Sequence, residues 1–277
     1  MLFQTSSTLW TYLSRLNRQV RFLIKRLITA FITIPIFLAM IYYEGLFLQV
    51  GLAIMVVIGL YEFSRFYQNQ VYWDYLLLAG LSLLALAYTG LYDSFLVLWF
   101  AIQLIYYLIR ATFTDYKPLE QIWQMAAVFY VAGLFSFIWL LRTDFGFKWV
   151  IFGVFITWIT DSTAYFTGLK YGKTQLAPKI SPKKTIEGSI GGLIGATAVG
   201  LVFAVIYSYS IIAVVLLSAA LSVIGQMGDL VESAIKRERG VKDSGRILPG
   251  HGGILDRFDS MLFVLPSLYF LLRIFIV

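Results

Sequence analysis

The stretch from Leu248 to Asp259, "LPGHGGILDRFD", combines several polar and charged side chains in a chain that is otherwise largely apolar. It contains three glycines, an arginine, two aspartates and the only histidine of the protein, His251. Carboxylates are the hard oxygen ligands that Mg²⁺ prefers, and glycine turns let the backbone approach an oxyanion closely. The stretch therefore favours a site that binds a metal cation together with a polyanion.

Three aspartates are the candidate metal ligands. Asp256 and Asp259 are three residues apart, so they share one face if a helix runs through them into the last apolar segment. Asp229 follows another apolar segment, and a carboxylate at a membrane border is costly unless it is paired or bound to metal. Spacing alone leaves two interpretations of Asp256 open: a metal ligand, or an ion pair with Arg257 or a nearby lysine.

A second group of charged residues lies upstream, in "SPKKT" at 181–185. Lys183 and Lys184 directly precede an expected helix, with Thr185 as its N-cap. Lysines beside a helix N-terminus bind phosphates, because the backbone amides and the helix dipole add to their charge. Their alternative role is ordinary positive-inside anchoring. Glu187 either caps this helix or pairs with one of the two lysines.

Asp161 lies inside an apolar segment, "FITWITDSTAYFTG". An ionisable residue within a membrane span indicates function by default. The alternative is an aspartate hydrogen-bonded to Ser162, Thr163 or a neighbouring helix, and we favour the functional interpretation. A lone histidine such as His251 is weak evidence, because it more often makes a structural hydrogen bond than acts as an acid, a base or a ligand.

Composition identifies the elements that must position these residues. Of the 277 residues, 60% are hydrophobic and 13% charged, about half the charged share of a soluble domain. Several apolar runs approach the roughly 20 residues needed to cross a bilayer. The sequence therefore predicts an all-α, polytopic integral membrane protein. It contains no cysteine, which excludes thiolate catalysis, cysteine-ligated clusters and disulfides.

Apolar segments between polar breaks predict nine transmembrane helices. Very short connections near Glu44, Asp93 and Ser208–Tyr209 predict tight antiparallel hairpins, and the glycines of "GSIGGLIGATAVG" predict a helix-packing face. The expected spans are 27–43, 45–61, 75–92, 94–109, 122–141, 149–168, 188–208, 209–228 and 260–277.

The basic residues predict the orientation of these spans. With alternating loops, all of the 22 lysines and arginines except Arg142, Lys148 and Arg273 fall on the side of the N-terminus. By the positive-inside rule that side is cytoplasmic. The net charge of +7 then mainly reflects basic residues that set the orientation of the spans in the membrane. We therefore do not expect nucleic acid as a partner.

We expect three regions along the chain. Residues 1–26 form a cytoplasmic amphipathic segment, residues 27–148 form spans one to five, and residues 149–277 form a catalytic transmembrane region. This last region contains the two long polar loops, 169–187 and 229–259. The second loop balances six basic residues against six acids, as expected for a site that binds both cations and polyanions.

These residues together resemble the CDP-diacylglycerol synthases, also called phosphatidate cytidylyltransferases. The family signature, S-x-apolar-K-R-x4-K-D-x-small-x2-apolar-x2-H-G-G-apolar-x-D-R-apolar-D, is matched without departure from Ser233 to Asp259. A second block is also similar to the family, and the two blocks cover roughly the C-terminal 120 residues. The matching positions of the second block are Asp161, Gly172, Lys173, Ser181, Pro182, Lys183, Lys184, Thr185, Glu187 and Gly188.

The resemblance implies an all-helical enzyme, usually dimeric, that makes CDP-diacylglycerol and pyrophosphate from CTP and phosphatidic acid in the bacterial plasma (inner) membrane. It implies Mg²⁺ as cofactor, leaves a second cation open, and carries the metal-ligand role onto Asp229, Asp256 and Asp259. Catalytic or phosphate-binding roles fall on Asp161, Lys183, Lys184, Lys236, Arg237, Lys242, Asp243, His251 and Arg257, and nucleotide-binding roles on Lys173, Ser181, Thr185, Gly252 and Gly253.

Three other functions compete with this one. A CTP-dependent polyprenol or phytol kinase would transfer the γ-phosphate to an alcohol and would need a base to activate the hydroxyl. A transporter predicts charges distributed along the spans and an internal repeat, neither of which the sequence contains. A scaffold without chemistry leaves the balanced charges of 229–259 without a purpose.

Overall fold

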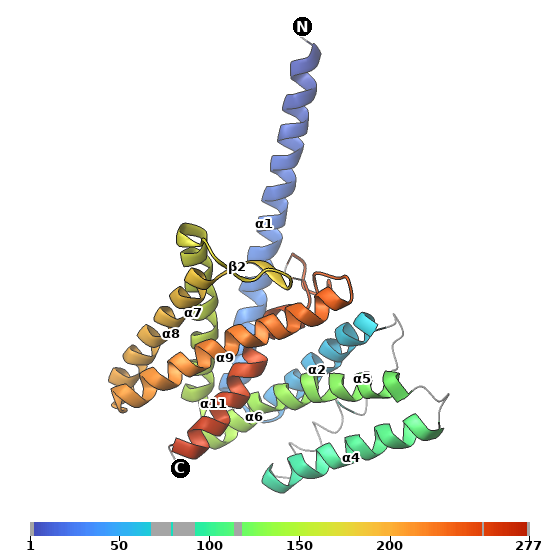
Figure 1. Ribbon diagram of the computed structural model, residues 1–277, viewed down its shortest axis with the longest axis vertical. Helices are drawn as coiled ribbons and strands as arrows, with labels where there is room; N and C mark the ends of the chain where they lie inside the picture. The colour runs from blue at the N-terminus through green and yellow to red at the C-terminus, as the bar shows by residue number, and fades with distance from the viewer. Residues whose placement is uncertain (1–2, 68–78, 80–91, 114–117, 251, 276–277) are drawn as a thin grey trace.

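The protein, in a computed structural model, is a helical bundle with one small β-hairpin (Figure 1). The structure describes residues 3–67, 79, 92–113, 118–250 and 252–275. The elements are α1 (Phe3–Tyr43), α2 (Gly45–Tyr67), α4 (Tyr92–Phe113), α5 (Pro118–Val128), the π-helix η1 (Phe129–Gly133), α6 (Leu134–Phe145), α7 (Phe147–Tyr171), β1 (Gln175–Ala177), β2 (Ser181–Thr185), α8 (Ile186–Tyr207), α9 (Ile211–Glu238), α10 (Leu255–Phe258) and α11 (Met261–Phe275).

The predicted all-α membrane architecture is confirmed. Within the described ranges, six helical stretches are long and apolar enough to cross a bilayer: Ile24–Tyr43, Gly45–Arg65, Ile122–Phe145, Phe147–Tyr171, Ile186–Tyr207 and Ile211–Glu238. Helices α4 and α11 also coincide with predicted spans. The predicted span 75–92 lies almost entirely outside the described residues, so the count of nine stays a prediction.

Helices α7 and α8 run side by side, as the glycine-rich segment predicts (Figure 1). A Cβ atom added at Gly191 would collide with the side chain of Thr167, and one added at Gly195 would collide with Thr163. The glycines therefore allow the two helices to approach closely. The predicted hairpin after α8 is also present, since Ser208 ends the helix in the left-handed conformation and α9 begins at Ile211.

The N-terminal helices pack against the end of the chain. The ring of Phe258, in α10, lies 5.1 Å from that of Phe37 in α1 and 5.4 Å from that of Phe135 in α6. Leu255 is fully buried and contacts α2 beside Gly59. The stretch around Asp256 is therefore enclosed by helices from the N-terminal half of the chain.

Three local predictions differ from the structure. Segment 169–187 is mostly an antiparallel hairpin of β1 and β2 rather than an irregular loop. Helix α9 continues to Glu238, so the first third of 229–259 is helical. The helix expected to run through Asp256 and Asp259 ends at Phe258, because the Asp259 side chain accepts the backbone N–H of Ser260 and competes with helical bonding.

The long first helix differs in extent from the expected segments. Helix α1 is continuous from Phe3 to Tyr43, without a break at residue 26, and its N-terminal part projects beyond the other helices (Figure 1). Its turn into α2 is as tight as predicted, since only Glu44, with a φ of 57°, separates the two helices.

Candidate functional site

The two polar segments predicted to form the site lie against each other. Lys184, in β2, forms an ion pair with Asp229 in α9. Arg237, near the end of α9, donates its Nε–H to the carbonyl of Ile180 at 3.2 Å. Segments that are far apart in the sequence therefore form one polar region at the same end of α7, α8 and α9.

The start of α8 is fixed by two side chains. Thr185 accepts the backbone N–H of Gly188 at 3.1 Å, which confirms the predicted N-cap. Glu187 has a role beyond the two that the sequence predicts. Its carboxylate accepts the backbone N–H groups of Lys173 and Thr174, at 3.0 and 3.2 Å, and so ties the hairpin to the helix.

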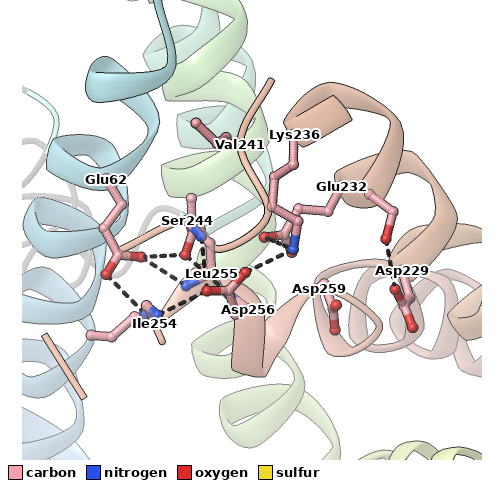
Figure 2. Close-up of polar contacts among 12 residues, drawn as sticks. Glu62, Asp229, Glu232, Lys236, Val241, Ser244, Ile254, Leu255, Asp256 and Asp259 are labelled. Carbon is pink, nitrogen blue, oxygen red and sulfur yellow. Dashed lines mark hydrogen bonds and ion pairs between the residues drawn. The ribbon is translucent and has the colours of Figure 1, made fainter. Parts of the chain in front are cut away.

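Asp256 is held by donors from three parts of the chain. Its Oδ1 accepts from Lys236 Nζ at 2.7 Å, and its Oδ2 accepts the backbone N–H groups of Ser244 and Gly253, each at 2.8 Å (Figure 2). Burial on its own would raise the pKa of Asp256, but these donors outweigh it and hold the pKa below its ordinary value. The ion pair with a nearby lysine, one of the two interpretations left open, is present.

Lys236 is buried between two acids. Its Nζ lies 3.2 Å from Glu232 Oε1 and 2.7 Å from Asp256 Oδ1, with side chains only 8%, 1% and 7% exposed. This lysine was assigned to the phosphates from the resemblance. In the structure its ammonium group instead compensates two buried carboxylates, a pairing that a buried charge requires.

Acidic side chains gather next to this ion-pair network. Asp259 is half-buried, and its desolvation raises its pKa well above the ordinary value, together with the negative charges of Asp229, Glu232 and Asp161. Among the described residues, the Lys236 ammonium group faces Glu232 Oε1 at 3.2 Å, and Glu232 Oε2 accepts no hydrogen bond. Several carboxylates thus gather beside the basic side chains of Lys184, Lys236 and Arg257.

These oxygen donors match a hard divalent cation in chemistry and in charge. Ion pairing with Lys184 and a hydrogen bond from Ser233 at 3.3 Å orient Asp229 toward the region, and Figure 2 shows Asp229 and Asp259 on the same side of the network. Across the described ranges, however, no three acidic or histidine side chains already converge on one point. The donors fit the predicted metal, whereas a complete ligand set is not assembled.

A cavity of about 500 Å³ opens beside the aspartates. Its wall is mostly apolar and comes from α1, α2, α7, the signature loop, α10 and α11. Its polar lining residues are Thr33 of α1 and, from α7 and the end of the signature, Asp161, Asp256, Arg257 and Asp259. The apolar residues that line it are Ala30, Ile34, Ile36, Phe37, Met40, Gly51, Ile54, Met55, Trp158, Leu248, Ile254, Phe258 and Met261. Membrane-spanning helices and predicted site residues thus line the same cavity.

Most of the remaining predicted residues have exposed side chains. Ser181 is the first residue of β2 and is half-buried. His251 lies outside the described residues. The side chains of Lys173, Lys183, Arg237, Lys242 and Asp243 are exposed.

The glycines of the signature surround buried carboxylates. Gly252 has a φ of 87°, and a Cβ atom there would lie 2.6 Å from Asp256 Oδ2. A Cβ atom at Gly253 would collide with Ser244 and Glu62. Leu248 and Gly252 exchange two backbone hydrogen bonds, of 3.0 and 3.1 Å, which close the tight turn expected from the sequence.

Sequence reasoning missed the residues that hold this turn from the N-terminal half. Arg26 and Thr29, both in α1, donate to the carbonyls of Gly250 and Pro249 at 2.7 and 3.0 Å. Glu62, in α2, accepts hydrogen bonds from the loop and is 1% exposed. The rule applied to Asp161 would have found Glu62, but the predicted span two ended at Tyr61, one residue too early.

Comparison with known proteins agrees with the resemblance found in the sequence. The chain is 48% identical over 153 residues to a phosphatidate cytidylyltransferase of Bacillus subtilis (strain 168), and 51% identical over 150 residues to one of Staphylococcus haemolyticus (strain JCSC1435). These alignments cover 54% and 53% of this chain and 57% of each relative, so the match spans little more than half the length of the relatives.

A family model extends the similarity to nearly the whole chain. The model of the cytidylyltransferase family matches residues 24–275, which include α1 from residue 24 onward, α2 and the glycine-rich turn that they hold. The chain therefore belongs to the cytidylyltransferase family.

Proposed function

We propose that this protein is a phosphatidate cytidylyltransferase, which converts CTP and phosphatidic acid into CDP-diacylglycerol and pyrophosphate. The observation that carries the proposal is the cavity, with its mostly apolar wall and its polar lining residues Asp161, Asp256, Arg257 and Asp259. Such a cavity suits an amphiphilic substrate whose phosphate must meet a water-soluble one. The relatives named above bear the name of this activity.

The chemistry requires little from a general base. An oxygen of the phosphatidate attacks the α-phosphorus of CTP, a new P–O bond forms, and the bond to the β-phosphate breaks as pyrophosphate leaves. The attacking phosphate is already largely ionised at neutral pH, because its second pKa is near 6. The main obstacle is the repulsion between two polyanions, so positioning and cationic groups dominate catalysis.

The described side chains divide this work. Lys183, Lys242 and Arg237 are exposed beside the site and would attract the triphosphate. Arg257 lines the cavity and would meet the phosphate of the lipid. Lys184 is half-buried and paired with Asp229, so we assign it to orienting that carboxylate as well as to the phosphates.

Mg²⁺ is the proposed cofactor, held by Asp229, Asp256 and Asp259. Bound there, it would neutralise phosphate charge that builds up as pyrophosphate leaves. The gathering of Asp229, Glu232 and Asp161 around Asp259 supports this assignment. Because Asp256 already accepts three hydrogen bonds, Asp229 and Asp259 have the stronger case.

We also propose a homodimer in the bacterial plasma membrane, with the N-terminus and both polar segments in the cytoplasm. The dimer follows from the family resemblance. The cytoplasmic side is supported by the distribution of basic residues, and CTP is available there.

Labelled CTP tests the activity directly. Detergent-purified protein would be incubated with Mg²⁺, phosphatidic acid and CTP labelled at the α- or the γ-phosphate. We expect the α-label in the lipid and pyrophosphate release that depends on the lipid. Transfer of the γ-label to an added polyprenol would instead identify a lipid kinase, and the absence of any lipid-dependent release would overturn the proposal.

A further inference from the structure

Glu62 is a buried acid that the proposed chemistry does not use. It lies one turn after Gly59 in α2, a helix from the N-terminal half of the chain. Both of its carboxylate oxygens face the signature loop (Figure 2). Burying a carboxylate costs free energy unless hydrogen-bond donors satisfy it. The donors that contact Glu62 therefore indicate its structural role.

Three donors from the loop converge on this carboxylate. The backbone N–H of Ile254 donates to Oε1 at 3.0 Å, and that of Leu255 donates to Oε2 at 3.1 Å. The hydroxyl of Ser244 also donates to Oε2, at 3.0 Å. Glu62 thereby joins the two ends of the segment 244–255.

The same loop residues hold Asp256. Ser244 donates its backbone N–H to Asp256 Oδ2 at 2.8 Å, and its hydroxyl accepts the backbone N–H of Asp256 at 3.4 Å. One serine therefore contacts the carboxylate of Glu62 and both the backbone and the side chain of Asp256. A shift of Glu62 would displace Asp256 through this shared partner.

Two signature glycines fit the same arrangement. A Cβ atom at Gly245 or at Gly253 would collide with the carboxylate of Glu62. Both positions must therefore lack a side chain for the loop to close around this acid. The resemblance predicts a nucleotide-binding role for Gly253, and in the structure this glycine lies against Glu62.

We propose that Glu62 is a positioning residue, which presets the signature loop so that Asp256 and its neighbours face the cavity. This inference rests on the proposed function for its kinetic effect only. The loop-holding contact itself is independent of any substrate.

Glu62→Gln is the sharpest variant, because it preserves the shape and removes one acceptor. Whichever way the amide turns, its NH₂ group faces the N–H of Ile254 or that of Leu255. Ser64→Ala is the matched control: Ser64 is buried in the same helix but donates to the carbonyl of Tyr61 within that helix.

Two readouts distinguish positioning from a general structural role. In hydrogen exchange, the amides of 244–255 should exchange about tenfold or more faster in Glu62→Gln, with α8 and α9 unchanged. In the labelled-CTP assay, kcat should fall about tenfold to a hundredfold, while the KM for phosphatidic acid stays within about twofold because the apolar wall is intact. Glu62→Asp, which retains the charge, should recover part of kcat.

The outcomes separate this inference from the proposed function. Wild-type exchange in the loop of Glu62→Gln, or faster exchange throughout α8 and α9 as well, would overturn the positioning role. A wild-type protein without lipid-dependent release would refute the proposed function, and the exchange comparison with Ser64→Ala would still decide the role of Glu62.

Discussion

Asp256 links the ion-pair network to the cavity, and both of its oxygens face donors. Lys236 approaches one oxygen, and the N–H groups of Ser244 and Gly253 approach the other. An asparagine would turn its NH₂ group toward one of these donors and would also remove a charge. The residue therefore combines an electrostatic role with a structural one, and the two are separable by substitution.

Asp256→Asn should abolish turnover, by a factor of about a hundred or more, while the protein still folds and dimerises. The fold should survive because Lys236 keeps its pairing with Glu232. Pyrophosphate release measures the first effect, and size-exclusion chromatography in detergent measures the second. Substantial Mg²⁺-dependent turnover in the variant would remove Asp256 from the metal role.

Lys236→Met should destabilise the protein by about 3–5 kcal/mol, because it leaves two buried carboxylates without their cation. The expected observation is a lower melting temperature in detergent. Lys179→Met, at an exposed position of the hairpin turn, is the control and should melt like the wild type. A wild-type melting temperature for Lys236→Met, combined with a raised KM for CTP, would instead place Lys236 on the phosphates.

At the scale of elements, the sequence predicted the helices better than their ends. Apolar length is a strong signal, and it located α2, α7, α8 and α9. The hairpin of β1 and β2 was missed because its strands are short and half-exposed, without an apolar alternation to mark them. The break after α10 depends on one side chain bonding to the next backbone N–H, which no periodicity reveals.

In the candidate site, too, the local sequence predicts some features, whereas others depend on contacts between residues far apart in the chain. Signature residues such as Asp256 and Lys236 were identified by motif, but their ion pair spans 20 residues and depends on how α9 and α10 pack. Glu62 and Thr29 lie in segments that match the signature nowhere, and they reach the loop only through the fold. The motifs therefore identify the residues of the site, whereas their interaction partners are known only from the packing of the helices.

Helix α1 should matter for turnover through its contact with the turn. The hydroxyl of Thr29 is shared between two carbonyls, that of Pro249 at 3.0 Å and that of Lys25 in its own helix at 2.9 Å. Thr29→Val removes the contact with the turn and should lower kcat about threefold to tenfold. Thr112→Val in α4 is the matched control, since Thr112 is exposed and donates within its own helix, to Leu108. Equal kcat values for the two variants would show that this contact does not support the site.

At the scale of the whole molecule, the distribution of lysines and arginines predicts on which side of the membrane the site lies. The polar segments meet at one end of the bundle through Lys184 and Asp229, so they must share a side of the membrane. Only three of the 22 lysines and arginines fall on the other side in the predicted topology. That imbalance predicts a cytoplasmic site, which is also the side on which CTP is found.

Single cysteines can test this orientation, because the chain has none of its own. We expect Ser210→Cys, in the turn before α9, to react with a membrane-impermeant maleimide on intact bacterial cells. Lys179→Cys, in the hairpin, should react only after permeabilisation. Both positions are exposed, and Ser210 makes no capping hydrogen bond with its side chain, so neither change should disturb the fold. The reverse pattern would place the site outside the cytoplasm, and equal labelling on intact cells would contradict the predicted alternation of loops.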